Sequence, residues 1–154
     1  INCEKPGKNC GEKNLRNLCL VLDTNEYIGA LSVAKNPACE ELLNRILDTP
    51  SKFSVCLPRT IVNEVRRNVP PIIFSQFIKI TNAIATVDED FSVPFELGSK
   101  YEGFGLKSAD SFIAAYTEWI QADILVSENR HFLSQASNLP FRVLTAERCL
   151  KLLR

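Results

Sequence analysis

The chain contains the stretch Leu18-Cys19-Leu20-Val21-Leu22-Asp23-Thr24-Asn25-Glu26, which is the clearest indication of its architecture. The first five residues form a continuous apolar run, the pattern of a strand that is buried on both faces of a parallel sheet. Asp23 follows this strand, and in open α/β sheets the carboxyl ends of the strands are where ligands bind. A helix is expected directly afterwards. Asp23 is therefore either a catalytic ligand or the N-cap of that helix.

Similar patterns recur along the rest of the chain. We expect further strands at residues 53–57, 84–87, 123–126 and 142–144, and helices at 26–33, 39–47, 59–69, 72–80, 95–101, 108–120 and 145–153. Pro37 is expected to break the chain, and Ser108 to cap the helix that follows it. Strands that alternate with helices predict a parallel sheet with right-handed crossovers. The fold class is therefore α/β, a three-layer α/β/α sandwich with a central, mainly parallel sheet.

Length and composition fit one globular domain. The chain has 154 residues, of which 45% are hydrophobic, enough for a sizeable core. Residues 1–16 are interpreted as an irregular polar leader, and residues 17–154 as a single domain. Basic and acidic residues number 18 each, so no overall basic field attracts nucleic acid. No apolar stretch approaches the roughly 20 residues that span a bilayer, so we expect no membrane segment.

The six cysteines do not form the pattern of a disulfide scaffold. Four of them lie in apolar segments, where cysteine behaves as a small buried hydrophobe: Cys19, Cys39, Cys56 and Cys149. Cys3 and Cys10 lie in the polar leader, and their spacing is not that of a standard zinc half-site. A reducing, cytoplasmic location is the expectation.

Four polar side chains are placed to meet at one edge of the predicted sheet: Asp23, Glu64, Asp110 and Asn129. Each follows a strand or stands near the start of a helix, and the carboxyl ends of parallel strands share an edge. Mg²⁺ and Mn²⁺ prefer clustered carboxylate oxygens and leave room for water and phosphate. Such ions activate water in phosphodiester cleavage. The spacing therefore favours a site for a hard divalent cation.

Two of these acids have simpler explanations. Glu64 either pairs with Arg67 or lies on a solvated helix face, although Ile61 and Val65 place it beside the apolar stripe. Asp110 stands in the first turn of a helix, where an acid complements the helix dipole.

The ordered motifs of the chain resemble those of PIN domains. The motifs are Val21-Leu22-Asp23-Thr24-Asn25, Ile61-Val62-Asn63-Glu64-Val65, the segment 105–115 with Asp110, and the segment 122–132 with Ser127 and Asn129. The resemblance covers the chain from about Leu18 to the C-terminus. No motif is specific alone, but their order and intervals together are.

The resemblance implies an endoribonuclease that needs Mg²⁺ or Mn²⁺ and cuts single-stranded RNA, often as the toxin of a toxin–antitoxin pair. Asp23, Glu64 and Asp110 match the three acids that hold the metal, with Glu64 acting through water. Ser127 matches the usual hydroxyl residue after the late strand, and Asn25 a residue that supports the first acid. An antitoxin protein and a second copy of the chain are the implied partners.

Asn129 departs from the pattern, because many members of that family carry an aspartate there. An asparagine still offers a carbonyl oxygen to a metal, but without charge, so it is expected to be a weak ligand. The alternative function is therefore a PIN-like module that has lost hydrolysis and binds RNA or a protein partner. A phosphatase-like reading of Asp23 is disfavoured, because that chemistry wants a second aspartate where Asn25 stands.

Local positive charge is needed to bind RNA, because the chain as a whole is neutral. Arg66, Lys107 and Arg130 are the candidates, although each is more readily explained as a solvated surface charge. His131, the single histidine, is more readily a packing or capping residue than a general base. The aromatic residues of the later helices are interpreted as core or dimer-interface residues: Tyr101, Phe112, Tyr116 and Trp119.

Overall fold

The computed structural model describes residues 17–154, which form a five-stranded sheet. The strands are β1 (Leu18–Leu22), β2 (Phe53–Pro58), β3 (Ala85–Asp88), β4 (Ile124–Val126) and β5 (Arg142–Leu144). Their order is β3-β2-β1-β4-β5, and every neighbouring pair is parallel. The α/β fold class and the parallel sheet are confirmed.

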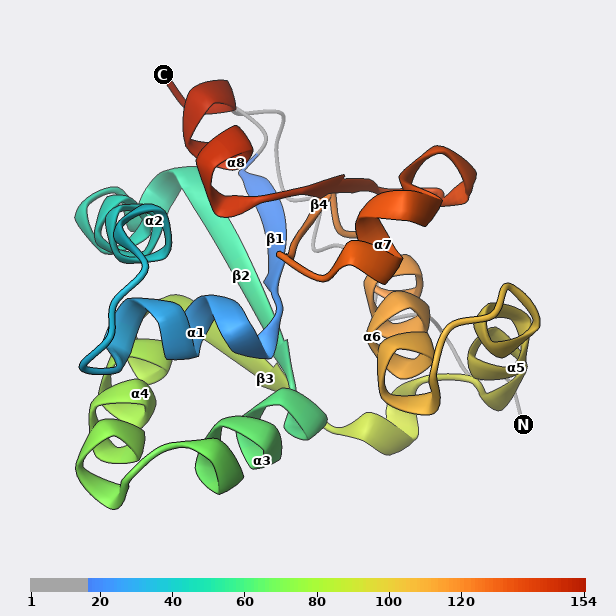
Figure 1. Ribbon diagram of the computed structural model, residues 1–154, viewed down its shortest axis with the longest axis horizontal. Coiled ribbons are helices and arrows are strands. Elements are labelled where there is room, and N and C mark those ends of the chain that lie inside the picture. The colour runs from blue at the N-terminus through green and yellow to red at the C-terminus, as the bar shows by residue number, and fades with distance from the viewer. Residues whose placement is uncertain (1–16) are drawn as a thin grey trace.

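Eight helices within the described residues cover this sheet (Figure 1). They are α1 (Thr24–Leu31), α2 (Pro37–Asp48), α3 (Arg59–Asn68), α4 (Pro71–Ile84), α5 (Phe95–Gly103), α6 (Ser108–Trp119), α7 (Arg130–Gln135) and α8 (Ala146–Leu152). Helices α1 to α4 lie on one side of the sheet, and α5 and α6 lie on the other. This arrangement is the expected three-layer sandwich.

The central strand β1 lies at the point where the chain changes direction across the sheet. From β1 the chain moves to β2 and then β3, whereas β4 and β5 lie on the opposite side of β1. The backbone N–H of Asp23 donates to the Val126 carbonyl at 2.9 Å, which joins the ends of β1 and β4. In doubly wound sheets the crevice at such a reversal is where ligands bind.

The strands form the core because their side chains are apolar on both faces. Leu20, Val21 and the whole of β4 are buried. Above the sheet, Tyr116 of α6 is fully buried and donates a hydrogen bond of 2.5 Å to Asp88, the last residue of β3. A buried phenol needs such a partner, and this one fixes α6 against the end of the sheet.

Several helix ends differ from those predicted. Pro37 begins α2, with Asn36 as its N-cap, because proline is well suited to the first turn of a helix. Ser108 is the first residue of α6 and does not cap it; the N-cap is Lys107, whose side chain makes no capping hydrogen bond. Helix α7 was not predicted, because it is short and buries a single residue, Phe132.

Of the four cysteines in the described part of the chain, two are buried as the sequence suggested and two are half-buried. Cys39 and Cys149 are buried free thiols, and the sulfur atoms of Cys19 and Cys56 lie 3.9 Å apart. Cys3, Cys10 and the predicted polar leader of residues 1–16 lie outside the described residues. Over residues 17–154, no helix has the length and apolar character that crossing a membrane requires.

Candidate functional site

Asp23 makes the contacts of a helix cap, and it makes them at the carboxyl edge of the sheet. Its Oδ1 accepts a hydrogen bond of 2.8 Å from the backbone N–H of Thr24, and Asp23 is the N-cap of α1. Its Oδ2 accepts one of 2.7 Å from the hydroxyl of Ser127, which follows β4. Each carboxylate oxygen has two lone pairs, so both keep capacity for a metal ion. Capping and metal binding by Asp23 are therefore compatible.

Ser127 connects Asp23 to the two remaining polar residues on this side. Its Oγ also accepts a hydrogen bond of 3.0 Å from the backbone N–H of Asn129. The side-chain amide of Asn129 donates through Nδ2 to Oδ2 of Asp110 at 3.1 Å. A continuous series of hydrogen bonds thus joins Asp23, Ser127, Asn129 and Asp110, although these residues come from three separate segments.

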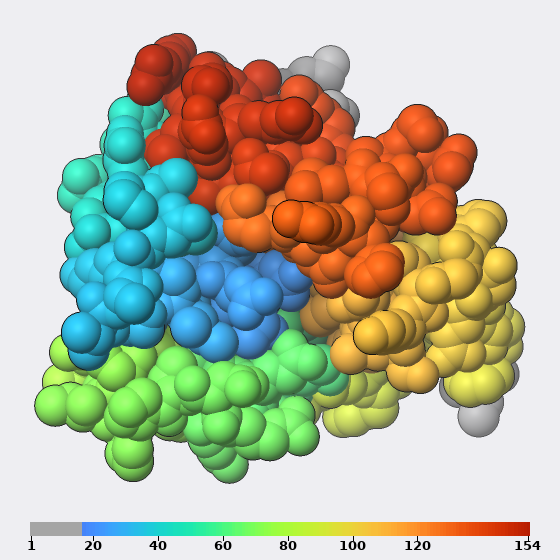
Figure 2. All heavy atoms as spheres, viewed as in Figure 1, coloured from blue at the N-terminus to red at the C-terminus, as the bar shows by residue number. Residues whose placement is uncertain are grey.

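Glu64 approaches the site from α3. Its Oε2 accepts a short hydrogen bond from the hydroxyl of Thr24, the residue after Asp23. The pairing of Glu64 with Arg67 that the sequence left open is not the contact found, because Arg67 donates to the Asn63 carbonyl. On the face shown in Figure 2, the surface of α1 (blue) lies between those of α3 and α4 (green) and that of the segment after β4 (orange).

The electrostatics of Asp23 reflect its burial among other acids. Burial raises the pKa of this carboxyl, and the negative charges of Asp110 and Glu64 raise it further. The hydrogen bonds from Ser127 and Thr24 act in the opposite direction, because they stabilise the carboxylate. A cation bound beside these acids would relieve both the desolvation and the mutual repulsion.

The three acids approach one another without closing into a tight ligand set. Asp23, Glu64 and Asp110 are not a group whose ligand atoms all lie within 4.8 Å of one another. Within residues 17–154, such a group is formed instead by Glu26, Cys39 and Glu128. The predicted acids therefore need either a bridging water or a small closure of their side chains to share one ion.

The contacts of Asn129 and Asn25 differ from those that the sequence suggested. The carbonyl oxygen of Asn129 accepts from the backbone N–H of His131 at 2.9 Å and caps α7, while its NH₂ group faces Asp110. In the reverse amide orientation, the Asn129 oxygen would face the Asp110 carboxylate and the NH₂ group would face the His131 N–H, so neither hydrogen bond would form. Asn25 is exposed, and in the described chain the hydrogen bonds to the Asp23 carboxylate come from Thr24 and Ser127.

The basic candidates are all exposed. Lys107 immediately precedes α6, and Arg130 is the first residue of α7, so each is close in sequence to Asp110 or Asn129. The guanidinium of Arg66 lies over the Phe74 ring, 5.4 Å from its centroid. His131 is also exposed, and its contact with Asn129 is through the backbone.

Thr24 is the contact that the sequence interpretation missed. A threonine at the start of a helix is common and does not stand out in a sequence, and its partner Glu64 lies 40 positions away. The order Asp-Thr at the end of a buried strand is the signal that places this hydroxyl beside Asp23.

No family model matches the sequence, and no curated protein matches it. Several solved structures resemble it in three dimensions, among them the following two. One is the crystal structure of VapBC2 from Rickettsia felis bound to a DNA fragment from their promoter, with a TM-score of 0.60 and 15% identity over 83% of this chain and 98% of that chain. The other is FitAcB from Neisseria gonorrhoeae, with a TM-score of 0.57 and 18% identity over the same shares. At such low identity, the likeness shows the fold.

Proposed function

We propose that the chain is an endoribonuclease of the PIN class, dependent on Mg²⁺ or Mn²⁺, that hydrolyses phosphodiester bonds of single-stranded RNA. The observation that carries the proposal is the hydrogen-bonded series from Asp23 through Ser127 and Asn129 to Asp110, with Glu64 joined through Thr24. The motif resemblance and the fold shared with VapBC2 and FitAcB chains support it.

The donor set suits a hard cation. Asp23 and Asp110 offer carboxylate oxygens, and Glu64 is joined to Thr24, the residue after Asp23, and would act through a water. Burial and the negative charges of Asp110 and Glu64 raise the pKa of Asp23, and a bound cation would offset both effects. Asp23, Asp110 and Glu64 would therefore hold the ion. When bound, such an ion activates water and neutralises charge at the scissile phosphate.

The neighbouring residues hold these acids in place. Ser127 and the Thr24 N–H fix both oxygens of Asp23, and the Thr24 hydroxyl fixes Glu64. Asn129 fixes Asp110 through its NH₂ group, so we assign it as a positioning residue. Support of this kind keeps ligands near their working geometry and lowers the cost of ordering them when a substrate binds.

We assign the contacts with RNA to basic side chains that flank the acids. Lys107 and Arg130 stand at the starts of α6 and α7, next to the segments that carry Asp110 and Asn129. Their charges would attract the phosphate backbone locally, which the neutral chain as a whole does not do. Arg66 is a weaker candidate, because its guanidinium already lies over Phe74.

We also propose that an antitoxin protein binds the chain. The chain itself is proposed to form a homodimer in the cytoplasm. The solved structures with the same fold bear the names VapBC2 and FitAcB, and the first was bound to promoter DNA. The gene next to the one for this chain is the direct check. A short open reading frame whose product co-purifies with the chain is expected.

A second function is favoured by one observation. Asn129 supplies an amide where a fourth carboxylate would strengthen metal binding, and its NH₂ group offsets part of the charge of Asp110. A chain of this kind could bind RNA or a protein without cutting RNA.

The test is an RNA cleavage assay with the purified chain. Single-stranded and double-stranded oligonucleotides of one sequence are incubated with Mn²⁺ or with EDTA. We expect cleavage of the single strand in Mn²⁺ alone. RNA that is retained in a gel-shift assay but stays intact would favour the binding module, and neither cleavage nor retention would overturn both the ribonuclease and the RNA-binding module.

A further inference from the structure

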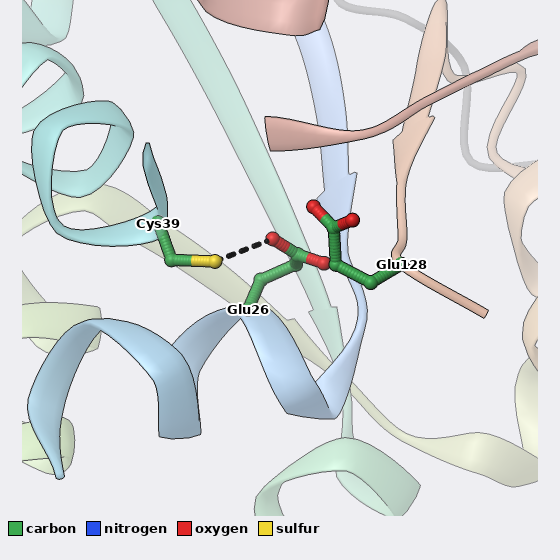
Figure 3. A group of neighbouring side chains, drawn as sticks. All are labelled: Glu26, Cys39 and Glu128. Atoms are coloured by element: carbon green, nitrogen blue, oxygen red, sulfur yellow. Dashed lines mark hydrogen bonds between the residues drawn. The ribbon is translucent and has the colours of Figure 1, made fainter. Parts of the chain in front are cut away.

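Three potential metal ligands meet on the side of α1 that faces α2. They are Glu26 of α1, Cys39 of α2 and Glu128, which follows β4 (Figure 3). One carboxylate oxygen from each glutamate and the Cys39 sulfur all lie within 4.8 Å of one another. Three separate segments of the chain therefore bring ligand atoms to one point.

Close packing of α1 and α2 creates this meeting. A Cβ atom on Gly29 would lie 3.2 Å from the Cys39 sulfur and 3.2 Å from the Asn36 Cβ. Glycine at this place, one helical turn after Glu26, lets Cys39 lie against α1. The Cys39 thiol then donates a hydrogen bond of 3.0 Å to Oε2 of Glu26.

Glu26 is a buried acid, and one of its carboxylate oxygens lacks a hydrogen-bond partner within the described chain. The residue is 3% exposed, and its Oε1 is buried without a hydrogen-bond partner among the described residues. An unsatisfied buried polar atom is unfavourable, and more so if it is charged, so native proteins rarely keep one. The Cys39 thiol donates to Oε2, and the backbone N–H of Glu128 lies near the carboxylate without making a hydrogen bond of full geometry to Oε1. Oε1 is the observation that points to a missing ligand.

Glu128 is the third potential ligand of the group, and its side chain is exposed. Its Oε1 accepts a hydrogen bond of 3.0 Å from the backbone N–H of Ala146, at the start of α8. Outer contacts of this kind orient a ligating carboxylate and are typical of metal sites. Because Glu128 is exposed, the group is open to solvent on that side.

We propose that Glu26, Cys39 and Glu128 bind a Zn²⁺ ion, with a solvent water completing four-coordination. A thiolate with two carboxylates suits a borderline-soft ion and not Mg²⁺, which prefers oxygen ligands alone. Tetrahedral zinc with these ligands sets sulfur and oxygen about 3.5 Å apart. The three ligand atoms, which lie within 4.8 Å of one another, would draw closer together around the ion. The Cys39 thiol loses its proton to solvent when the ion binds.

This zinc site is independent of the proposed ribonuclease. Asp23, Glu64 and Asp110 form no part of it, and its sulfur ligand selects a different class of ion. Its consequence is structural, because the ion would join α1, α2 and the segment after β4 near the edge of the sheet.

The experiment is a Co²⁺ titration of the full chain under reducing conditions, followed by Zn²⁺ competition. Co²⁺ replaces Zn²⁺ and gives a thiolate charge-transfer band in the near ultraviolet. We expect one equivalent to produce the band and Zn²⁺ to abolish it. Cys39→Ser should remove the band, whereas Cys149→Ser, which changes another buried cysteine, should keep it.

Two further comparisons keep the result interpretable. Glu128→Gln changes an exposed residue and should weaken Co²⁺ binding by more than about tenfold, the loss that even an outer-contact mutation causes. Glu41→Gln, an exposed acid of α2, should not weaken it. The titration is repeated with Cys3 and Cys10 both changed to serine, which should leave the band intact. The proposal is overturned by no band at one equivalent, or by a band that survives in Cys39→Ser.

Discussion

The hydroxyl of Ser127 donates a hydrogen bond of 2.7 Å to Oδ2 of Asp23, although 104 positions of sequence separate the two residues. Both side chains are buried, Ser127 completely. The contact joins the ends of β1 and β4 at the point where the order of the sheet reverses. The most informative acid of the sequence is therefore held by a residue from the other half of the fold.

Loss of the Ser127 hydroxyl should destabilise the protein. Ser127→Ala leaves Oδ2 of Asp23 and the N–H of Asn129 without their partner. We expect the free energy of unfolding to fall by about 1–3 kcal/mol, measured by urea denaturation. Ser108→Ala is the control, since Ser108 is exposed and makes no capping contact. Equal effects of the two changes would show that the buried hydrogen bond contributes nothing.

Restoring a carboxylate at position 129 should change metal binding. Asn129→Asp replaces the NH₂ group that faces Asp110 with a negative charge, while an oxygen remains to cap α7. We expect lower stability in EDTA, because the two acids repel, and tighter Mn²⁺ binding by titration calorimetry. Asn44→Asp, at an exposed site on α2, should alter neither. Unchanged Mn²⁺ affinity in Asn129→Asp would mean that this side chain does not face the ion.

The Thr24 hydroxyl should matter through Glu64. Thr24→Val keeps the shape of the side chain but removes the donor to Glu64. We expect weaker Mn²⁺ binding in Thr24→Val and near-native binding in Thr24→Ser, which keeps the hydroxyl. If both variants bind Mn²⁺ equally well, the hydrogen bond to Glu64 does not position a ligand.

Glu26 should make the metal-free protein less stable as pH rises. Burial is the main cause that raises the pKa of Glu26 from 4.5 to about 7, and the Cys39 thiol opposes it. The folded state holds this proton more tightly than the unfolded chain does. Its stabilising effect is therefore complete below pH 4.5 and is lost as pH rises through about 7.

The pKa difference corresponds to roughly 3 kcal/mol, from 4.5 to about 7. Glu26→Gln should flatten the fall of the unfolding free energy across this range, measured by denaturation in EDTA. Glu41→Gln should leave the slope as in the native protein. A slope that is the same in the native chain and in Glu26→Gln would contradict the assignment.

The sheet was predictable because burial on both faces leaves a strong sequence signal. The strands at Leu18–Leu22 and Arg142–Leu144 begin and end as predicted. Helix ends were harder, because one turn of helix carries few apolar positions. Pro37 illustrates this: the same residue that breaks a helix interior also begins a helix well, and the sequence pattern alone does not separate the two.

The site could be predicted as a set of residue types at one edge, but not as a set of contacts. The amide orientation of Asn129 is set in three dimensions by the His131 N–H, which donates to its oxygen, and by Asp110, which accepts from its NH₂ group. The buried state of Glu26 depends on how closely α1 and α2 approach, which Gly29 permits. A first-turn acid in sequence more often complements the helix dipole at the surface.

Under the proposed function, Asp23 and Asp110 would hold the metal ion on which RNA cleavage depends. The most direct test is the cleavage rate of a single-stranded RNA in Mn²⁺ for the native chain, Asp23→Asn and Asp110→Asn. Asp48→Asn serves as control, because Asp48 is exposed at the end of α2 that leads into β2. Circular dichroism establishes that each variant is folded. We predict that cleavage is lost in the first two variants and kept in the third; equal cleavage by all four proteins would contradict the account.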